Sequence, residues 1–189
     1  ASTVELLPSE KTFTSVGDTV TLSATVKDAA GSVISDPTVT WASADTTVAT
    51  VSSVGLVTAV VNGTDTITAT SGSASGTAVV TVAQAASSVA LSSDSLAFTS
   101  LADTTTLTAT VKDAGGTVIS GATVTWTSSD ASLATVSSAG LVTSVANGTV
   151  TITATSGSAS ATTVTTVDLM LVEFLTGSGQ TARTGSAVE

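Results

Sequence analysis

The stretch Thr38-Val39-Thr40-Trp41 is followed by Ala42-Ser43-Ala44-Asp45, and it returns as Thr123-Val124-Thr125-Trp126 followed by Thr127-Ser128-Ser129-Asp130. Val and Trp alternate with Thr in both copies, which is the period-two pattern of a half-buried β-strand. The two copies contain both Trp residues of the chain. Each Trp is therefore predicted to lie at the centre of a small hydrophobic core.

The two copies lie 85 positions apart, and the same shift superimposes the surrounding sequence without a gap. Phe13 then falls on Phe98, and Thr66 to Ala74 falls on Thr151 to Ala159. A gapless match of this length indicates tandem duplication of a whole domain. Because Phe13, Phe98 and the two Trp residues occupy equivalent positions, we expect all four to be core anchors. The predicted divisions are domain 1 at 1–84, domain 2 at 85–167 and a C-terminal segment at 168–189.

The composition favours β-structure, because Val, Ile and Thr fit a pleated surface and aromatic residues make up only 3% of the chain. Turn residues recur every 8–12 positions or so, which is typical of a β-sandwich of roughly seven strands. No stretch shows helical periodicity. Asn62-Gly63 indicates a hairpin, and the stretch that follows Leu7, through Phe13, is predicted to be irregular. The residues of Thr19–Lys27 that are predicted to face inward are Val20, Leu22, Ala24 and Val26. The strands expected in the first copy are Thr3–Leu7, Thr19–Lys27, Thr38–Ser43, Val48–Val51, Leu56–Val60, Thr64–Thr70 and Thr77–Val82.

A set of short motifs carries a more specific resemblance. In the first copy these are Trp41, Val48-Ala49-Thr50-Val51, Gly55-Leu56-Val57-Thr58, Asn62-Gly63-Thr64 and Ile67-Thr68-Ala69, and the second copy repeats most of them 85 positions later. The set resembles the bacterial immunoglobulin-like domain, group 2, the intimin/invasin-type module. The resemblance implies an all-β fold of two tandem immunoglobulin-like sandwiches without a disulfide. The linker Ala83-Gln84-Ala85-Ala86-Ser87 is short and lacks Pro and Gly, so the two sandwiches are expected to lie end to end. Family members occur in adhesins, surface-layer and secreted proteins and phage structural proteins, and they share no active site, so the resemblance implies a fold and a location.

The charge and residue inventory exclude several classes of function. The formal net charge is -10 with only four Lys and Arg residues, so the basic footprint of a nucleic-acid-binding protein is missing. No apolar run approaches the roughly 20 residues of a membrane span, so direct membrane insertion is not expected. The chain has no His, Cys or Tyr, and no acid–base constellation can be named. We therefore expect no enzyme activity, no catalytic residue and no cofactor.

Binding of a metal or a sugar has weak support in the sequence. A calcium ion near the domain junction would have Glu5, Asp94 or Asp103 as oxygen ligands, but solvated loop carboxylates explain these residues equally well, and no metal site is predicted. Sugar binding needs exposed aromatic platforms, and only Phe174 lies outside the equivalent core positions.

The C-terminal segment differs from both copies. It begins with an apolar run that contains the only Met, and then becomes rich in Gly and Ser. Two interpretations stay open for the apolar run: it extends or packs on the second sandwich, or it docks on another protein. The candidate docking residues are Leu169, Met170, Leu171, Val172, Phe174 and Leu175.

These observations predict a non-catalytic, extracytoplasmic structural protein, periplasmic or at the cell surface. The role expected first is an accessory or scaffold subunit whose partners are proteins, with a membrane protein complex as one possible host. The alternatives are an adhesin stalk or surface-layer spacer, and a carbohydrate-binding module. Position 1 is Ala rather than Met, which fits either a removed signal peptide or a fragment.

Overall fold

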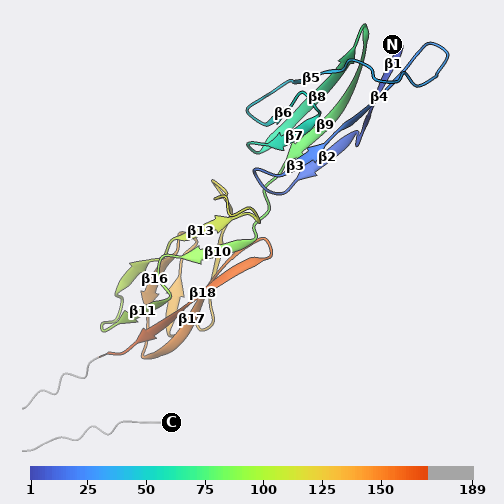
Figure 1. Cartoon of the computed structure of the whole chain (residues 1–189). Helices are drawn as coiled ribbons and strands as arrows, with labels where there is room; N and C mark the ends of the chain where they lie inside the picture. The colour runs from blue at the N-terminus through green and yellow to red at the C-terminus, as the bar shows by residue number, and fades with distance from the viewer. Residues whose placement is uncertain (170–189) are drawn as a thin grey trace, which may run out of the picture.

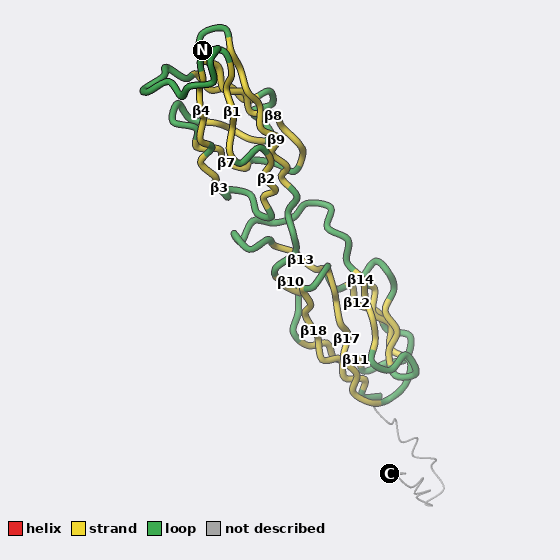
Figure 2. The backbone as a smooth tube through the Cα atoms, turned by 90° about the vertical axis from the view of Figure 1, so that its right-hand side faces the viewer, coloured by secondary structure: helices red, strands yellow, loops and turns green. Residues whose placement is uncertain are grey.

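The computed structural model describes residues 1–169, which form two β-sandwiches joined end to end, and no helix occurs in this range (Figures 1 and 2). The first sandwich, domain 1, contains β1 (Thr3–Leu7), β2 (Glu10–Phe13), β3 (Thr19–Thr21), β4 (Ser23–Lys27), β5 (Thr40–Ser43), β6 (Ala49–Val51), β7 (Leu56–Ala59), β8 (Gly63–Ser71) and β9 (Ala74–Val82). The second, domain 2, contains β10 (Ser88–Leu91), β11 (Ser95–Phe98), β12 (Thr104–Thr106), β13 (Ala109–Lys112), β14 (Thr125–Ser128), β15 (Ala134–Val136), β16 (Leu141–Ser144), β17 (Gly148–Ser156) and β18 (Ala159–Val167). The prediction of two tandem all-β, immunoglobulin-like sandwiches is confirmed.

Both domains have the same sheet topology. In domain 1 a four-stranded sheet of order β2-β9-β8-β5 faces a three-stranded sheet β3-β7-β6 and the pair β1-β4. Strand β2 runs parallel to β9, whereas the other pairs are antiparallel. The chain thus changes sheets between β1 and β2. The prediction of an irregular stretch through Phe13 is wrong for Glu10–Phe13, because these residues form β2 and pair with β9.

The stretch Thr19–Lys27 was predicted to be one strand, and the structure divides it at Leu22 into β3 and β4. The N–H of Leu22 donates to the carbonyl of Gly55 at 2.8 Å, while β3 pairs with β7 and β4 pairs with β1. The predicted inward positions are nevertheless right: Leu22 and Val26 are 2% and 1% exposed, and Val20 and Ala24 are partly buried and pack against the core.

Asn62-Gly63 does not form the predicted hairpin, because β7 and β8 belong to different sheets. The turn carries the chain between the sheets, and Asn62 Oδ1 accepts a hydrogen bond from the backbone N–H of Gln84 at 2.9 Å. Gly63 has φ 155°, and a Cβ there would lie 2.9 Å from Cγ2 of Val48. Close packing explains this glycine better than hairpin geometry does.

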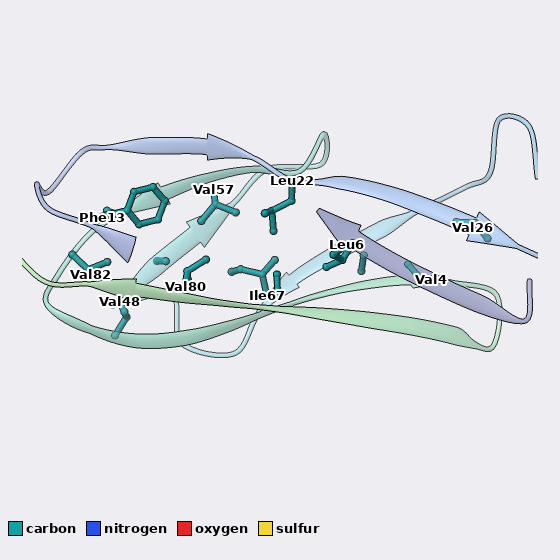
Figure 3. Close-up of a cluster of buried hydrophobic side chains, with 14 of the residues drawn as sticks. Val4, Leu6, Phe13, Leu22, Val26, Val48, Val57, Ile67, Val80 and Val82 are labelled. Carbon is teal, nitrogen blue, oxygen red and sulfur yellow. The ribbon is translucent and has the colours of Figure 1, made fainter. Parts of the chain in front are cut away.

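The core of domain 1 lies between the sheets, around Phe13, Leu22, Val57 and Ile67 (Figure 3). Trp41 is only half-buried and packs against this core from β5, an edge strand. The prediction that Trp41 lies at the centre of the core is therefore wrong: Trp41 lies at the margin of the core, and Ile67, with no exposed surface, lies deeper.

Domain 2 repeats the arrangement. Trp126 packs against the core from β14, and Phe98 is 2% exposed. In each domain a glycine lies under the indole ring: a Cβ at Gly140 would lie 3.1 Å from Cζ2 of Trp126. The short turn before β16 therefore needs the absence of a side chain at this point.

Candidate functional site

The junction between the domains is the part of the described chain where side chains from both copies meet, and its construction begins with β9. Beyond the end of this strand, Ala83 donates its N–H to the carbonyl of Phe13 at 2.9 Å, and Ala85 donates to the carbonyl of Thr14 at 3.0 Å. These bonds continue the parallel pairing of β2 with β9. The first half of the linker is therefore an extension of the domain 1 sheet.

The rest of the linker is anchored in the same way. Gln84 donates its backbone N–H to Asn62, and Ser87 donates its own to the carbonyl of Lys112 at 2.8 Å in domain 2. Of the five linker residues 83–87, Ala86 alone has a backbone N–H that finds no hydrogen-bond partner within residues 1–169. A linker with one unanchored residue has little freedom to bend.

Asp113, which follows β13, links the two domains directly. Its Oδ2 accepts a hydrogen bond from Nε2 of Gln84 at 2.7 Å and from the backbone N–H of Val16 at 3.1 Å. Its Oδ1 accepts from the N–H of Thr117 at 2.8 Å, which closes its own loop. Asp113 is 2% exposed, so one nearly buried carboxylate holds a loop of domain 2, the linker and a loop of domain 1.

The hydrogen bonds to Asp113 also determine its protonation. The side-chain amide of Gln84 lowers the pKa of this carboxyl most, and the N–H groups of Thr117 and Val16 add to the effect, which outweighs the opposing effect of burial. The carboxylate is therefore charged at neutral pH, and these are charge-assisted hydrogen bonds.

Gly115 lets the two domains approach closely. A Cβ on this residue would lie 3.3 Å from the carbonyl oxygen of Val16 and 3.6 Å from Cβ of Ser15. Beside the contact, an open cleft of about 390 Å³ lies between the linker residues 84–86 and domain 2 loops that include Ile119 and Gly157. None of the residues that line this cleft is ionisable.

The acidic residues considered as calcium ligands do not converge on this junction. Glu5 forms an ion pair with Lys27 at 2.9 Å, and neither Asp94 nor Asp103 has a hydrogen bond across the junction. In the described range no group of three or more His, Cys, Asp or Glu side chains could hold a metal ion. Nor does that range contain a helix long and apolar enough to cross a membrane.

Of the candidate docking residues, only Leu169 falls within the described chain. It packs against the core of domain 2, and its N–H donates to Oδ1 of Asn147 at 2.7 Å. This bond repeats that between Gln84 and Asn62, 85 positions earlier. Met170, Leu171, Val172, Phe174 and Leu175 lie outside the described residues.

Sequence reasoning missed the residues that build the junction. It assigned Gln84 to the linker without a contact, and it gave Asp113 no role. The available signal was a difference between the copies: Gln84 corresponds to Leu169, and Gly115 corresponds to Ala30.

Comparison with known proteins gives one family and several structural likenesses. The family model described as bacterial Ig-like domain (group 2) matches residues 2–82 and again residues 85–167. The surface-layer protein SbsC, domains 1–6, is 28% identical over 82% of this chain, with a TM-score of 0.44, and the match spans 24% of that chain. The adhesin FdeC of Escherichia coli is 22% identical over 87% of this chain and 63% of that chain, with a TM-score of 0.45. Human protocadherin-24 EC1-2 is 13% identical over 87% of this chain and 98% of that chain, with a TM-score of 0.36. Among curated protein sequences there is no significant match.

Proposed function

The chain belongs to the bacterial Ig-like domain (group 2) family, and from this premise we propose that it is a stiff two-domain spacer in an extracytoplasmic structural protein. The proposed role is mechanical and non-catalytic: the chain holds whatever lies at its two ends at a constant separation. An adhesin stalk or a surface-layer segment is the setting that suits this role. The observation that carries the proposal is the junction at Asp113.

Stiffness follows from the way in which the junction is bonded. A flexible linker would leave its backbone groups to water, whereas three linker residues are bonded to domain 1 and one to domain 2. The Asp113 carboxylate then closes the contact from the side. Because this carboxylate is nearly buried, bending at the junction would break charge-assisted hydrogen bonds and expose Gln84.

Docking on a larger assembly through the apolar run is a second candidate, although Leu169, the one residue of that run within the described chain, itself packs on domain 2. Leu169 follows β18, which ends at the end of domain 2 that is far from domain 1 (Figure 1). A spacer with a docking segment at one end would combine the two roles. The carbohydrate alternative has less support, because Trp41 and Trp126 use their rings in core packing.

The spacer proposal is tested by the distance distribution between two spin labels, one in each domain. Val54 and Ala139 occupy equivalent exposed turns, and the chain has no native Cys to interfere. We expect the variant with Cys at both positions to give a narrow distribution. Asp113→Asn should broaden the distance distribution. The side-chain amide of Asn has one accepting oxygen in place of two, so the donors to either Oδ1 or Oδ2 of Asp113 lose their acceptor.

Asp28→Asn is the matched control. Asp28 is the equivalent residue of domain 1, and it lies away from the junction. This substitution should leave the distribution between positions 54 and 139 unchanged. A broad distribution in the unsubstituted chain would refute the spacer proposal.

A further inference from the structure

We propose that the end of domain 1 opposite the junction is a receiving surface for the C-terminal end of another Ig-like domain of this kind, with Asp28 as its hydrogen-bond acceptor. This inference rests on the proposed function and extends it, since it makes the two-domain chain one segment of a longer stiff array. The occupant is a domain that resembles domain 1 at its C-terminal end.

The receiving loop of domain 1 has the same construction as the loop that holds the junction. Oδ1 of Asp28 accepts hydrogen bonds from the N–H groups of Ala30 and Ser32, both at 2.9 Å. Its carbonyl accepts from Gly31 at 3.1 Å, as the carbonyl of Asp113 accepts from Gly116 at 3.0 Å. The loop therefore holds the Asp28 carboxylate in place without any contribution from a second domain.

The second carboxylate oxygen, Oδ2, has different surroundings in Asp28 and in Asp113. Oδ2 of Asp113 accepts both interdomain hydrogen bonds, whereas Oδ2 of Asp28 has no hydrogen-bond partner within residues 1–169, and Asp28 is exposed. The same side-chain atom is thus used between the domains in one copy and left to solvent in the other.

The path of an incoming linker is also present at this end. Ala1-Ser2 repeats Ala86-Ser87, and Ser2 donates its N–H to the carbonyl of Lys27 at 2.7 Å, as Ser87 does to that of Lys112 at 2.8 Å. A chain that enters domain 1 here arrives in the direction and register that the linker has at the existing junction.

These contacts specify what the occupant must offer: a backbone N–H at the position of Val16 and a side-chain amide at the position of Gln84. The far end of domain 2 has Leu101 and Leu169 at these positions. A second copy of this chain would therefore supply the N–H without the amide, and a domain that ends like domain 1 is the better complement.

One sequence difference between the domains changes how closely the incoming domain is expected to approach domain 1. Domain 1 has Ala30 where domain 2 has Gly115, and a Cβ at that position in the junction lies 3.3 Å from the carbonyl oxygen of Val16. The new contact must open by a few tenths of an ångström to accept this methyl group. Ala30→Gly should remove the need for this adjustment.

The test is a three-domain chain in which residues 1–85 precede Ala1 of the full chain. This fusion recreates Gln84-Ala85-Ala-Ser at the new junction, and Val54→Cys in both copies of domain 1 places one spin label on each side of it. We expect a distance distribution about as narrow as that of the existing junction. Asp28→Asn in the second copy should broaden it, and Ala30→Gly should keep it narrow or narrow it further.

The outcomes separate this inference from the proposed function. A broad distribution at the new junction beside a narrow one at the existing junction would overturn the inference and leave the spacer standing. Broadening by Asp113→Asn but not by Asp28→Asn would overturn it as well. Breadth at both junctions would refute the spacer itself. Concentration-dependent dimerisation of the unextended chain would identify a second copy as the occupant, against the inference.

Discussion

Replacing Thr165 with Val should stabilise domain 2. Thr165 lies on β18 with no exposed surface, and its Oγ1 has no hydrogen-bond partner among the described residues. Thr163, two residues earlier on the same strand, is also fully buried, but its hydroxyl donates to the carbonyl of Ser93 at 2.6 Å. Domain 1 has Val80 at the position of Thr165, equally buried. The substitution therefore copies a packing solution that the other copy already uses.

The magnitude follows from the chemistry of the hydroxyl group. Val and Thr have nearly the same shape, so Thr165→Val opens no cavity and removes only a buried polar group without a partner. Such a group costs about 1–3 kcal/mol in proteins. For a domain of this size, each 1 kcal/mol shifts the midpoint of thermal unfolding by about 4–8 °C. We expect the transition of domain 2 to rise by at least about 4 °C.

The assay must assign the change to a domain. Amide hydrogen exchange under native conditions measures the protection of β17 and β18 in domain 2 separately from that of β8 and β9 in domain 1 of the same molecule. Protection should increase in domain 2 and stay constant in domain 1. Val80→Thr is the matched reverse substitution and should destabilise domain 1 by about the same amount. Equal or lower stability of Thr165→Val would mean that the hydroxyl makes a favourable interaction, and the reasoning would fail.

Three further predictions concern Ala102 and Gly17, Asp65, and Asp113. Ala102 has φ 56°, whereas the equivalent Gly17 has φ 87° with open space around it. Because a positive φ strains Ala more than Gly, Ala102→Gly should stabilise domain 2 and Gly17→Ala should destabilise domain 1, each by about 0.5–1 kcal/mol. Urea titrations measure both changes, and changes of the opposite sign would contradict the prediction. Asp65, 3% exposed, accepts hydrogen bonds at 2.7–2.8 Å from two backbone N–H groups and from Ser43 Oγ, so Asp65→Ala should destabilise domain 1 by about 2–3 kcal/mol; an unchanged urea midpoint would refute it. Because the folded pKa of Asp113 is lowered, its contribution is complete at neutral pH and is lost as the pH falls below about 4 toward that folded value. The interdomain distance distribution should broaden over that range, and a constant width in folded protein would count against the assignment.

The sequence predicts the fold well where one face of a strand is buried. The alternation in Thr19–Lys27 identified Leu22 and Val26 as inward residues, and both are buried. It could not show the break at Leu22, because a period-two pattern reports faces and not pairing partners. The partner of the Leu22 N–H is the carbonyl of Gly55, 33 positions away in the sequence, and only the packed sheets bring the two together.

The junction was harder to predict for a related reason. Local sequence shows what Asp113 Oδ1 does, since Asp before a Gly-containing turn is typical of a side chain that accepts backbone N–H groups of its own loop. The use of Oδ2 depends on a loop 97 residues earlier. Neither composition nor periodicity contains that contact, and the residue therefore looked like an ordinary turn residue.

A tandem repeat nevertheless carries information about its own junctions. Most core positions face the same environment in both copies and keep the same residue, as with Phe13 and Phe98 or Ile67 and Ile152, although Val80 and Thr165 differ. Positions at the ends of the domains face different environments, because one end meets a neighbour here and the other does not. Gln84 against Leu169 and Gly115 against Ala30 are differences of this kind.

Asp28 and Asp113 are then the informative exception: the residue that holds the junction is the same in both copies, although only one of them holds a junction within the described chain. Loop closure alone, through Oδ1, would explain an identical Asp at both positions, so the use of Oδ2 at Asp28 has to be decided by measurement, and the three-domain chain makes that measurement.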